Sequence, residues 1–340
     1  MRPITTKTAA SAAVTGALLA GLVACGNDDR PAAAGDSENT GGKTAAVRLK
    51  SCGLDLNVTR PPRRAVALEQ NATEIMLALG LADRMVGTSY QTDPVLPELA
   101  DAYAKVPVLA KQYPGHEAVL AKEPDFLYST LSSAFAPEAA GERAGWASAG
   151  VPAYLSAHDC EQKGLTRKDV TFDAIFGEIN DIATVFGVKD RGTKVVDGLR
   201  ARLDRAVAAA PGGPGRDIMW YYSGTRTPYV AGKGGLPSTI SQLLGKKNTF
   251  DDVNQKWFAG GWEKIADRNP DVIVLADLTR GGDGDSAEAK KRFLRADPVT
   301  SKLDAVRHNR FVVVPGSAVD PSLRSVSAVE AVSKGLGSLR

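Results

Sequence analysis

Aromatic and cationic residues gather in the C-terminal half of the sequence. Phe, Trp and Tyr make up only 6% of the chain, yet the stretches WYYSGTR (220–226) and QKWF (255–258) place several of them beside Arg or Lys. Aromatic rings supply contact area, and a cation adds charge and cation–π attraction. This combination suits a bulky, flat or anionic ligand. The candidate ligand contacts in this half are Tyr222, Arg226, Tyr229, Trp257, Arg280 and Arg324.

The same residues also have a purely structural interpretation. Half of the side chains of a strand point into the core, so Trp220 is expected to be buried, and the tyrosines beside it fit the same environment. A lone Arg or Lys is usually a solvated surface charge. Both interpretations stay open for each candidate.

Short apolar runs alternate with helical stretches along most of the chain. The runs of the N-terminal half are AVAL (65–68), MVGT (85–88), VPVL (106–109), DFLY (125–128) and PAYL (152–155), and those of the C-terminal half are DIMWYY (217–222), DVIVL (271–275) and RFVVV (310–314). Such alternation predicts an α/β fold with mostly parallel sheets. A hairpin over residues 45–59 is expected to precede them, with its turn at 51–53.

Ligands of open α/β sheets bind beyond the carboxyl ends of the strands. The loops that follow the predicted strands are 69–71, 89–90, 111–113 and 129–133 in the first half, and 221–229, 254–261, 279–280 and the segment after Pro315 in the second. Within the first set, the candidate ligand contacts are Asn71, Tyr90 and Tyr113.

Two amphipathic helices separate these halves. Apolar residues recur at helical spacing from Phe172 to Phe186, and a second helix is expected over 190–210, before the PGGPG break. The second helix has Val195, Leu199 and their neighbours on one face, and on the opposite face Arg191, Lys194, Arg200, Arg202 and Arg205. The expected organisation is an N-terminal lobe (44–188), a connecting helix (189–210) and a C-terminal lobe (211–340).

Composition and motifs exclude several function classes. The net charge is +3 without a basic cluster, which argues against a nucleic-acid partner. The three His are far apart in sequence, which argues against a direct metal site. We find no G-x-S-x-G, no phosphate-binding loop and no H-E-x-x-H. We therefore expect no catalytic residues, no bound metal and no cofactor, and an extracytoplasmic enzyme is the disfavoured alternative.

The N-terminus has the pattern of an export signal. Arg2 and Lys7 precede an uncharged segment that ends in LVAC at residues 22–25. This ending resembles a bacterial lipobox, so we expect residues 1–24 to be removed and Cys25 to be lipidated. Residues 25–43 contain no apolar period and are expected to be a flexible tether. The chain is thus predicted to be anchored by lipid to the outer face of the bacterial cytoplasmic membrane.

Two cysteines remain in the body of the chain. Cys52 and Cys160 most simply form a disulfide in an oxidising compartment. The alternative is two separate free thiols.

The chain contains a short internal repeat, and four longer stretches resemble sequences of a known family. HEAVLAKEPDFLY (116–128) and WEKIADRNPDVIV (262–274) share Glu at the second position and Pro-Asp before an apolar strand. The longer stretches are PPRRAVALEQNATEIMLALGLADRMVGTS (61–89), EAVLAKEPDFLY (117–128), WEKIADRNPDVIVL (262–275) and FLRADPVTSKLDAVRHNRFVVV (293–314). Together they resemble the bacterial substrate-binding lipoproteins of ABC importers for iron–siderophores and vitamin B12, over about residues 45–340.

The resemblance implies two Rossmann-like lobes joined by one long rigid helix, with the ligand in the cleft between them. It implies an ABC permease dimer with a cytoplasmic ATPase as partner, and a role in permease docking for Glu117 and Glu263. The Cys52/Cys160 pair is similar to that of actinobacterial-type members. The expected function is capture of a ferric siderophore, most simply by a monomer. The alternatives are a corrinoid or another bulky anionic cofactor such as a coenzyme F420 precursor, or a ligand-sensing lipoprotein.

Overall fold

The five apolar runs of the N-terminal half form one parallel sheet. This computed structural model describes residues 46–160, 169–212 and 216–339. The strands are β3 (Ala65–Ala67), β4 (Met85–Ser89), β5 (Val108–Ala110), β6 (Phe126–Ser129) and β7 (Ala153–Leu155). They are ordered β5-β4-β3-β6-β7, and every neighbouring pair is parallel. The strands are apolar along nearly their whole length because both faces of a parallel sheet are covered. All five strands predicted for this half are confirmed.

Helices cover both faces of this sheet. Its helices and 3₁₀ turns are α1 (Gln70–Ala78), η1 (Ala82–Arg84), η2 (Pro97–Leu99), α2 (Ala100–Tyr103), α3 (His116–Leu120), η3 (Ser132–Phe135), α4 (Arg143–Ser148), η4 (Ala157–Asp159) and α5 (Phe172–Val185). Ala65 and Ala67 of β3 pack with residues of α1 and α5 in one apolar cluster, whereas Val66 between them packs with α3 and α4 in another. This alternation follows from the twofold side-chain period of a strand.

The second sheet is mixed. Its strands are β8 (Asp217–Ser223), β9 (Tyr229–Ala231), β10 (Lys247–Asn248), β11 (Trp257–Ala259), β12 (Val272–Asp277) and β13 (Phe311–Pro315). β10, β12 and β13 extend the sheet in parallel from β8, whereas β9 and β11 are antiparallel additions. The three predicted strands of this half are confirmed. Trp220 is 1% exposed, as expected, and packs on the opposite face of β8 from Tyr221.

The helices of the second half also lie on both faces of their sheet. They are α7 (Leu236–Leu243), α8 (Trp262–Arg268), α9 (Ala287–Ala296), η5 (Thr300–Lys302), α10 (Asp304–Arg307), η6 (Gly316–Val319) and α11 (Ser325–Ser338). α7 and α11 share the large apolar cluster that also contains α1 and α5, and α8, α9 and α10 pack in a separate cluster. One continuous core therefore joins the inner helices of both halves.

The repeated sequence folds into the same corner twice. In both copies a residue with positive φ, Glu123 or Asn269, directly precedes Pro-Asp. Asn269 is the C-cap of α8, whereas α3 ends at Leu120, three residues before Glu123. The aspartate of each copy then forms hydrogen bonds with the backbone at the start of the neighbouring strand. Asp125 bonds to the backbone of residues 63–64, and Asp271 bonds to the backbone of Asp217. Equivalent hydrogen bonds in equivalent places support the interpretation of the two segments as one repeated unit.

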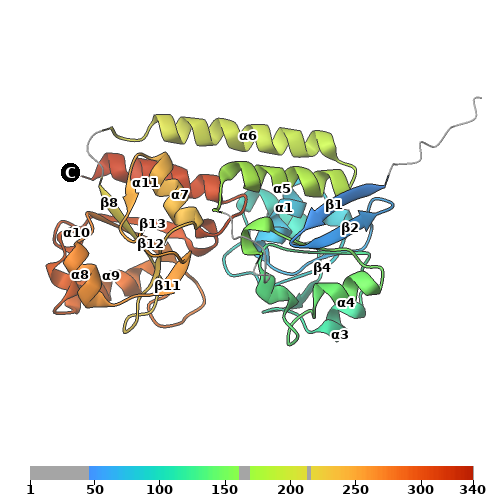
Figure 1. Ribbon diagram of the computed structural model, residues 1–340, viewed down its shortest axis with the longest axis horizontal. Helices are drawn as coiled ribbons and strands as arrows, with labels where there is room; N and C mark the ends of the chain where they lie inside the picture. Colours follow the sequence, from blue (N-terminus) through green and yellow to red (C-terminus); the bar gives the residue numbers. More distant parts are fainter. Residues whose placement is uncertain (1–45, 161–168, 213–215, 340) are drawn as a thin grey trace, which may run out of the picture. The chain divides into compact units, whose positions relative to one another are not determined.

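α6 (Lys189–Ala208) connects the two halves in the chain and packs on a helix of each. It runs along α5 and α11, at the top of Figure 1. Gly192 allows the close approach to α5, because a Cβ at this position would lie 2.5 Å from Cβ of Ala183. Toward α11, Arg202 forms an ion pair of 2.7 Å with Glu330. The predicted helix is confirmed within two residues at its C-terminal end.

A hairpin precedes the first sheet and is joined to it by a disulfide. β1 (Val47–Ser51) and β2 (Leu54–Val58) pair in antiparallel fashion across a turn at Cys52-Gly53. Cys52 is bonded to Cys160, just beyond β7 and η4, which confirms the predicted pairing. The proposed signal, Cys25 and the tether lie outside the described residues. Within the described ranges, no helix has the length and apolar character needed to cross a bilayer.

Candidate functional site

Six strands point their carboxyl ends at one small cavity. Its walls come from the end of β8 and from the segments that follow β3, β4, β6, β12 and β13, and its volume is about 60 Å³. The lining residues are Glu69, Gln70, Asn71, Tyr90, Thr92, Leu131, Tyr222, Arg280, Gly316, Ser317 and Asp320. Both halves of the chain contribute, as expected for a ligand site beyond strand ends. Of the nine sequence candidates, the cavity brings together Asn71, Tyr90, Tyr222 and Arg280.

Glu69 organises the first-half wall of the cavity. Its carboxylate caps α1 by accepting hydrogen bonds from the amides of Asn71 (2.6 Å) and Ala72 (3.0 Å), and it also accepts one from Thr130 N (2.9 Å). One buried side chain thereby joins the ends of β3 and β6. Burial raises the pKa of Glu69, and the backbone donors oppose that rise. The sequence marked this loop but did not single out Glu69.

Tyr90 has an unusual backbone conformation at the cavity. Its φ is +48°, in the left-handed region that favours glycine. The ring packs edge-on against Tyr113, with 4.6 Å between centroids, and the Tyr113 hydroxyl lies 2.8 Å from Oγ of Ser133. Such strain is typical of functional sites, and here it places an aromatic ring in the cavity wall.

A second aromatic group lies on the C-terminal side of the cavity. Tyr222 contacts Trp257 at 5.1 Å and Tyr229 at 6.2 Å between ring centroids, and Tyr229 stacks on Trp257 at 6.1 Å. Tyr229 is 40% exposed and Trp257 is half-buried. The guanidinium of Arg280 lies 5.3 Å from the Tyr222 ring centroid. The cluster thus combines accessible ring area with a cation, Arg280.

The predicted cations are largely neutralised by the protein itself. Arg280 pairs with Asp285 at 2.8 Å. Arg324 is buried and pairs with Glu74 at 2.5 Å, and it does not line the cavity. Arg226 is exposed. Because paired guanidinium groups leave little net positive charge, the cavity has weaker attraction for a strongly anionic ligand than the sequence suggested.

Direct contacts hold the two halves together around the cavity. Ser317 N donates to Asp93 Oδ2 (2.7 Å) and Thr279 Oγ1 donates to the carbonyl of Thr92 (2.5 Å). Lys256 donates to the carbonyl of His158. A pocket for a drug-sized ligand occupies about 300–1,000 Å³, so a bulky ligand enters only if these contacts open.

Asp320 makes the stability of this closed arrangement depend on pH. Burial, followed by the carboxylates of Asp159 and Glu69, raises the pKa of Asp320 to about 7, against the opposing effect of Lys256 and Arg280. The folded protein therefore binds this proton more tightly than the unfolded chain. The resulting stabilisation is complete below pH ~4. It is lost as the pH rises through about 7.

We expect Asp320→Asn to raise the unfolding temperature at pH 8 and to change it much less at pH 4, because the amide does not ionise. Thermal unfolding followed by circular dichroism at both pH values measures the difference. Asp101→Asn, at an exposed position of α2, is the matched control. An equal shift of the Asp320→Asn unfolding temperature at both pH values would contradict the assignment.

The two repeated glutamates are both exposed. Glu117 and Glu263 lie in the first turns of α3 and α8. Both helices lie on the side away from α6 in Figure 1. In the described part of the chain, neither carboxylate has an ion-pair or hydrogen-bond partner. Both are therefore available to another protein.

Comparison with known proteins gives one consistent result. Residues 66–318 match the periplasmic binding protein family. The chain is 23% identical over 287 residues to the uncharacterized ABC transporter substrate-binding lipoprotein YvrC of Bacillus subtilis (strain 168), covering 83% of this chain and 82% of that protein. It is 24% identical over 274 residues to the vitamin B12-binding protein of Vibrio parahaemolyticus, covering 79% and 87%.

A solved structure shares the fold. The crystal structure of an ABC-type Fe3+-hydroxamate transport system from Saccharomonospora viridis superposes with a TM-score of 0.72 at 23% identity, covering 86% of this chain and 99% of that one. The resemblance found in the sequence and the α/β fold that it implied are both confirmed. The family match spans most of the described body, including nearly all of both sheets and all of the residues that line the cavity except Asp320, and the chain therefore belongs to the periplasmic binding protein family.

Proposed function

We propose that this protein is the substrate-binding component of an ABC importer and that it captures a ferric siderophore outside the cytoplasmic membrane. The observation that carries the proposal is the pair of aromatic groups at the cavity: Tyr90 with Tyr113 on one half, and Tyr222 with Tyr229 and Trp257 on the other. Rings on two sides give a bulky, flat chelate large apolar contacts. No catalytic step is needed for this role.

The charge balance of the cavity refines the ligand class. Arg280 lines the cavity and is paired with Asp285, and Glu69 and Asp320 add acidic groups. A chelate with little net charge, such as a neutral ferric hydroxamate, fits this balance better than a polyanion. This argues against the coenzyme F420 precursor. The Saccharomonospora viridis structure of an Fe3+-hydroxamate transport system supports the proposal at the level of fold.

A corrinoid is the second candidate. The reason is specific: the Vibrio parahaemolyticus relative is a vitamin B12-binding protein, and it is aligned with 79% of this chain. The same aromatic surfaces suit a corrin ring. Titration of the protein with each ligand distinguishes these two candidates.

We expect saturable quenching of tryptophan fluorescence when a ferric hydroxamate is added, because Trp257 belongs to the aromatic cluster. Trp257→Phe should lose most of this signal while binding persists by calorimetry, whereas Trp146→Phe, in a separate apolar cluster, should leave the quenching unchanged. If cobalamin quenches the fluorescence and no ferric chelate does, the ligand is a corrinoid and the carrier role is retained. No change in fluorescence with any ferric chelate or with cobalamin would contradict the proposal.

Delivery requires a docking partner and an anchor. We propose that Cys25 carries the lipid anchor and that Glu117 and Glu263 dock to basic pockets of the two permease subunits. Two exposed carboxylates on equivalent helices can fix the orientation of the cavity over a two-fold permease, since charge pairs set register more than affinity.

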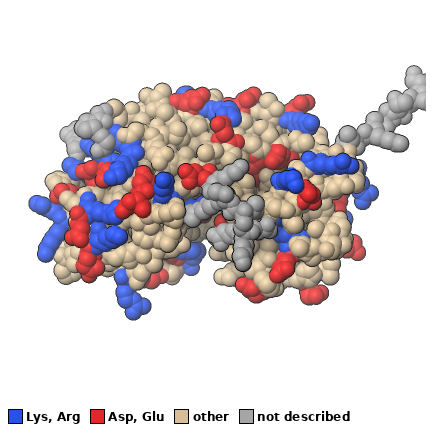
Figure 2. Space-filling view, viewed as in Figure 1, with Lys and Arg blue, Asp and Glu red and all other residues tan. Residues whose placement is uncertain are grey.

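We expect Glu117→Arg combined with Glu263→Arg to abolish ligand uptake by cells and to leave ligand affinity unchanged. Acidic and basic side chains are interspersed over the face of the molecule that Figure 2 shows. The matched control is Glu142→Arg with Glu288→Arg, which reverses exposed glutamates at the starts of α4 and α9. Uptake that persists in the first variant, or fails equally in the control, contradicts the docking assignment.

A further inference from the structure

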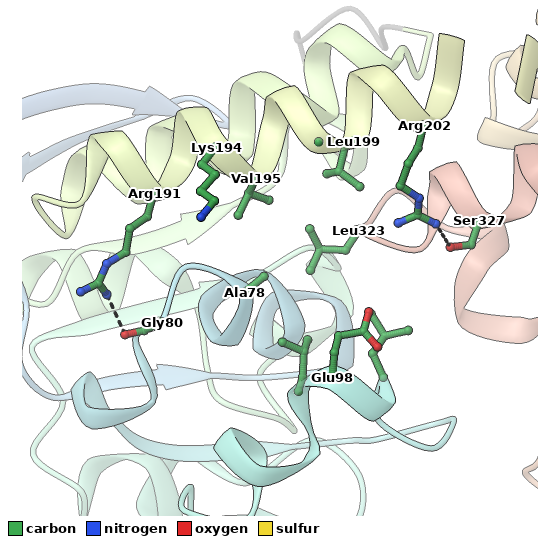
Figure 3. A pocket seen from close by; sticks show the side chains of 13 residues that line it. Ala78, Gly80, Glu98, Arg191, Lys194, Val195, Leu199, Arg202, Leu323 and Ser327 are labelled. Carbon is green, nitrogen blue, oxygen red and sulfur yellow. Dashed lines mark hydrogen bonds between the residues drawn. The ribbon is translucent and has the colours of Figure 1, made fainter. Parts of the chain in front are cut away.

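A second and larger pocket lies under α6. Its volume is about 570 Å³, within the range of small-molecule sites. α6 forms one wall, the end of α1 and the η2 turn form the opposite wall, and the start of α11 closes one end (Figure 3). It shares no lining residue with the cavity described above.

The walls of this pocket are mainly apolar. Val195 and Leu199 project from α6, and Leu323 lies near the start of α11 (Figure 3). Leu96 and Leu99, in the η2 region, also line the pocket. Gly198, on the same stretch of α6, adds open space, because a Cβ built there meets nothing within 4 Å. These surfaces can contact an alkyl chain along much of its length.

One end of the pocket is cationic. The sequence assigned Arg191, Lys194 and Arg202 to the outer face of α6, but all three line this pocket. Arg191 donates to the carbonyls of Leu79 (3.1 Å) and Gly80 (3.0 Å), which leaves its charge without a carboxylate. Among the described residues, Lys194 has neither an ion-pair nor a hydrogen-bond partner.

The other two charged residues that line the pocket, Arg202 and Glu98, lie toward its α11 end (Figure 3). Arg202 is compensated by Glu330 at 2.7 Å and also donates to Ser327. Glu98 acts electrostatically on Arg202 and Arg324. The pocket therefore has an uncompensated positive end at Arg191 and Lys194 and an apolar middle.

We propose that this pocket binds a small amphiphile that has one carboxylate and an unbranched alkyl chain. The carboxylate pairs with Lys194 and Arg191, and the chain lies along Val195, Leu199 and Leu323. A cation on an apolar wall favours this class over a neutral or cationic amphiphile, because only an anion gains the charge pair. The site is independent of the proposed carrier function.

The test is titration calorimetry with decanoate below its micelle concentration. The purified chain has Cys25→Ser, so that it carries no lipid and needs no detergent. We expect saturable one-to-one binding, weakened at least tenfold by Lys194→Glu. Arg205→Glu makes the same charge change at an exposed position of α6 outside the pocket and should bind as the parent does.

A filling variant tests the pocket without altering charge. Gly198→Phe should abolish decanoate binding, whereas Gly177→Phe, at an open position of α5 outside the pocket, should not. Decyltrimethylammonium should not bind, and Gly198→Phe should leave cavity ligand binding intact. The proposal is overturned if decanoate fails to saturate, if the cationic amphiphile binds equally, or if Lys194→Glu and Gly198→Phe both bind like the parent.

Discussion

Arg324→Ala should lower the free energy of unfolding by about 3–5 kcal/mol, because it leaves a buried carboxylate without its cation. Glu74 is fully buried in α1, and Arg324 donates to its two oxygens at 2.7 and 2.5 Å and to the carbonyl of Pro94 at 2.6 Å. The pair joins α1 of the first half to the start of α11 in the second. Its loss should therefore weaken the contact between halves as well as the local packing.

Urea unfolding followed by circular dichroism measures this loss. Arg324→Ala combined with Glu74→Gln should recover part of it, because a buried amide costs less than an unpaired carboxylate. Lys50→Ala is the matched control: it removes the cation of an ion pair with Asp55 in which both side chains are 80% exposed, and little change is expected. An Arg324→Ala midpoint equal to that of the parent would show that the pair contributes nothing.

The positions of the strands and of the loops around the cavity could be predicted from the sequence. Buried parallel strands need continuous apolar runs, and these are visible in residues such as 65–68 and 271–275. The carboxyl end of each run then locates a loop, which is why Asn71, Tyr90, Tyr222 and Arg280 were among the candidates. β9 and β11 were missed because three-residue antiparallel strands have too few residues for a period.

Pairing of charges could not be predicted in the same way. Arg324 and Glu74 are 250 residues apart, and no local pattern joins them. The same limit applies to Asp320, whose pKa is raised first by burial and then by Asp159 and Glu69 from the other half of the chain. The arginines of α6 show an error of a different kind. Arg191, Val195 and Arg202 stand at i, i+4 and i+11, so the helical period itself places both arginines beside Val195 and not on the opposite face.

Removing the disulfide by Cys52→Ser with Cys160→Ser should lower the free energy of unfolding by about 2–5 kcal/mol. The bond closes a loop of 108 residues that contains all five strands of the first sheet. In the chain-entropy account, a loop of that length restricts the unfolded chain strongly, with about 4–5 kcal/mol as the expectation for roughly 100 residues.

The folded state should survive this change, because other bonds hold the hairpin turn in place. Buried Arg143 donates to the carbonyls of Ser51 (2.7 Å) and Ala153 (2.9 Å), and Leu155 N donates to Oγ of Ser51 (2.8 Å). The double variant should thus keep its circular dichroism spectrum and ligand affinity while unfolding at lower urea concentration. Reductant should shift the parent to the midpoint of the variant and leave the variant unchanged. If reductant lowers both midpoints equally, the stabilisation comes from something other than this bond.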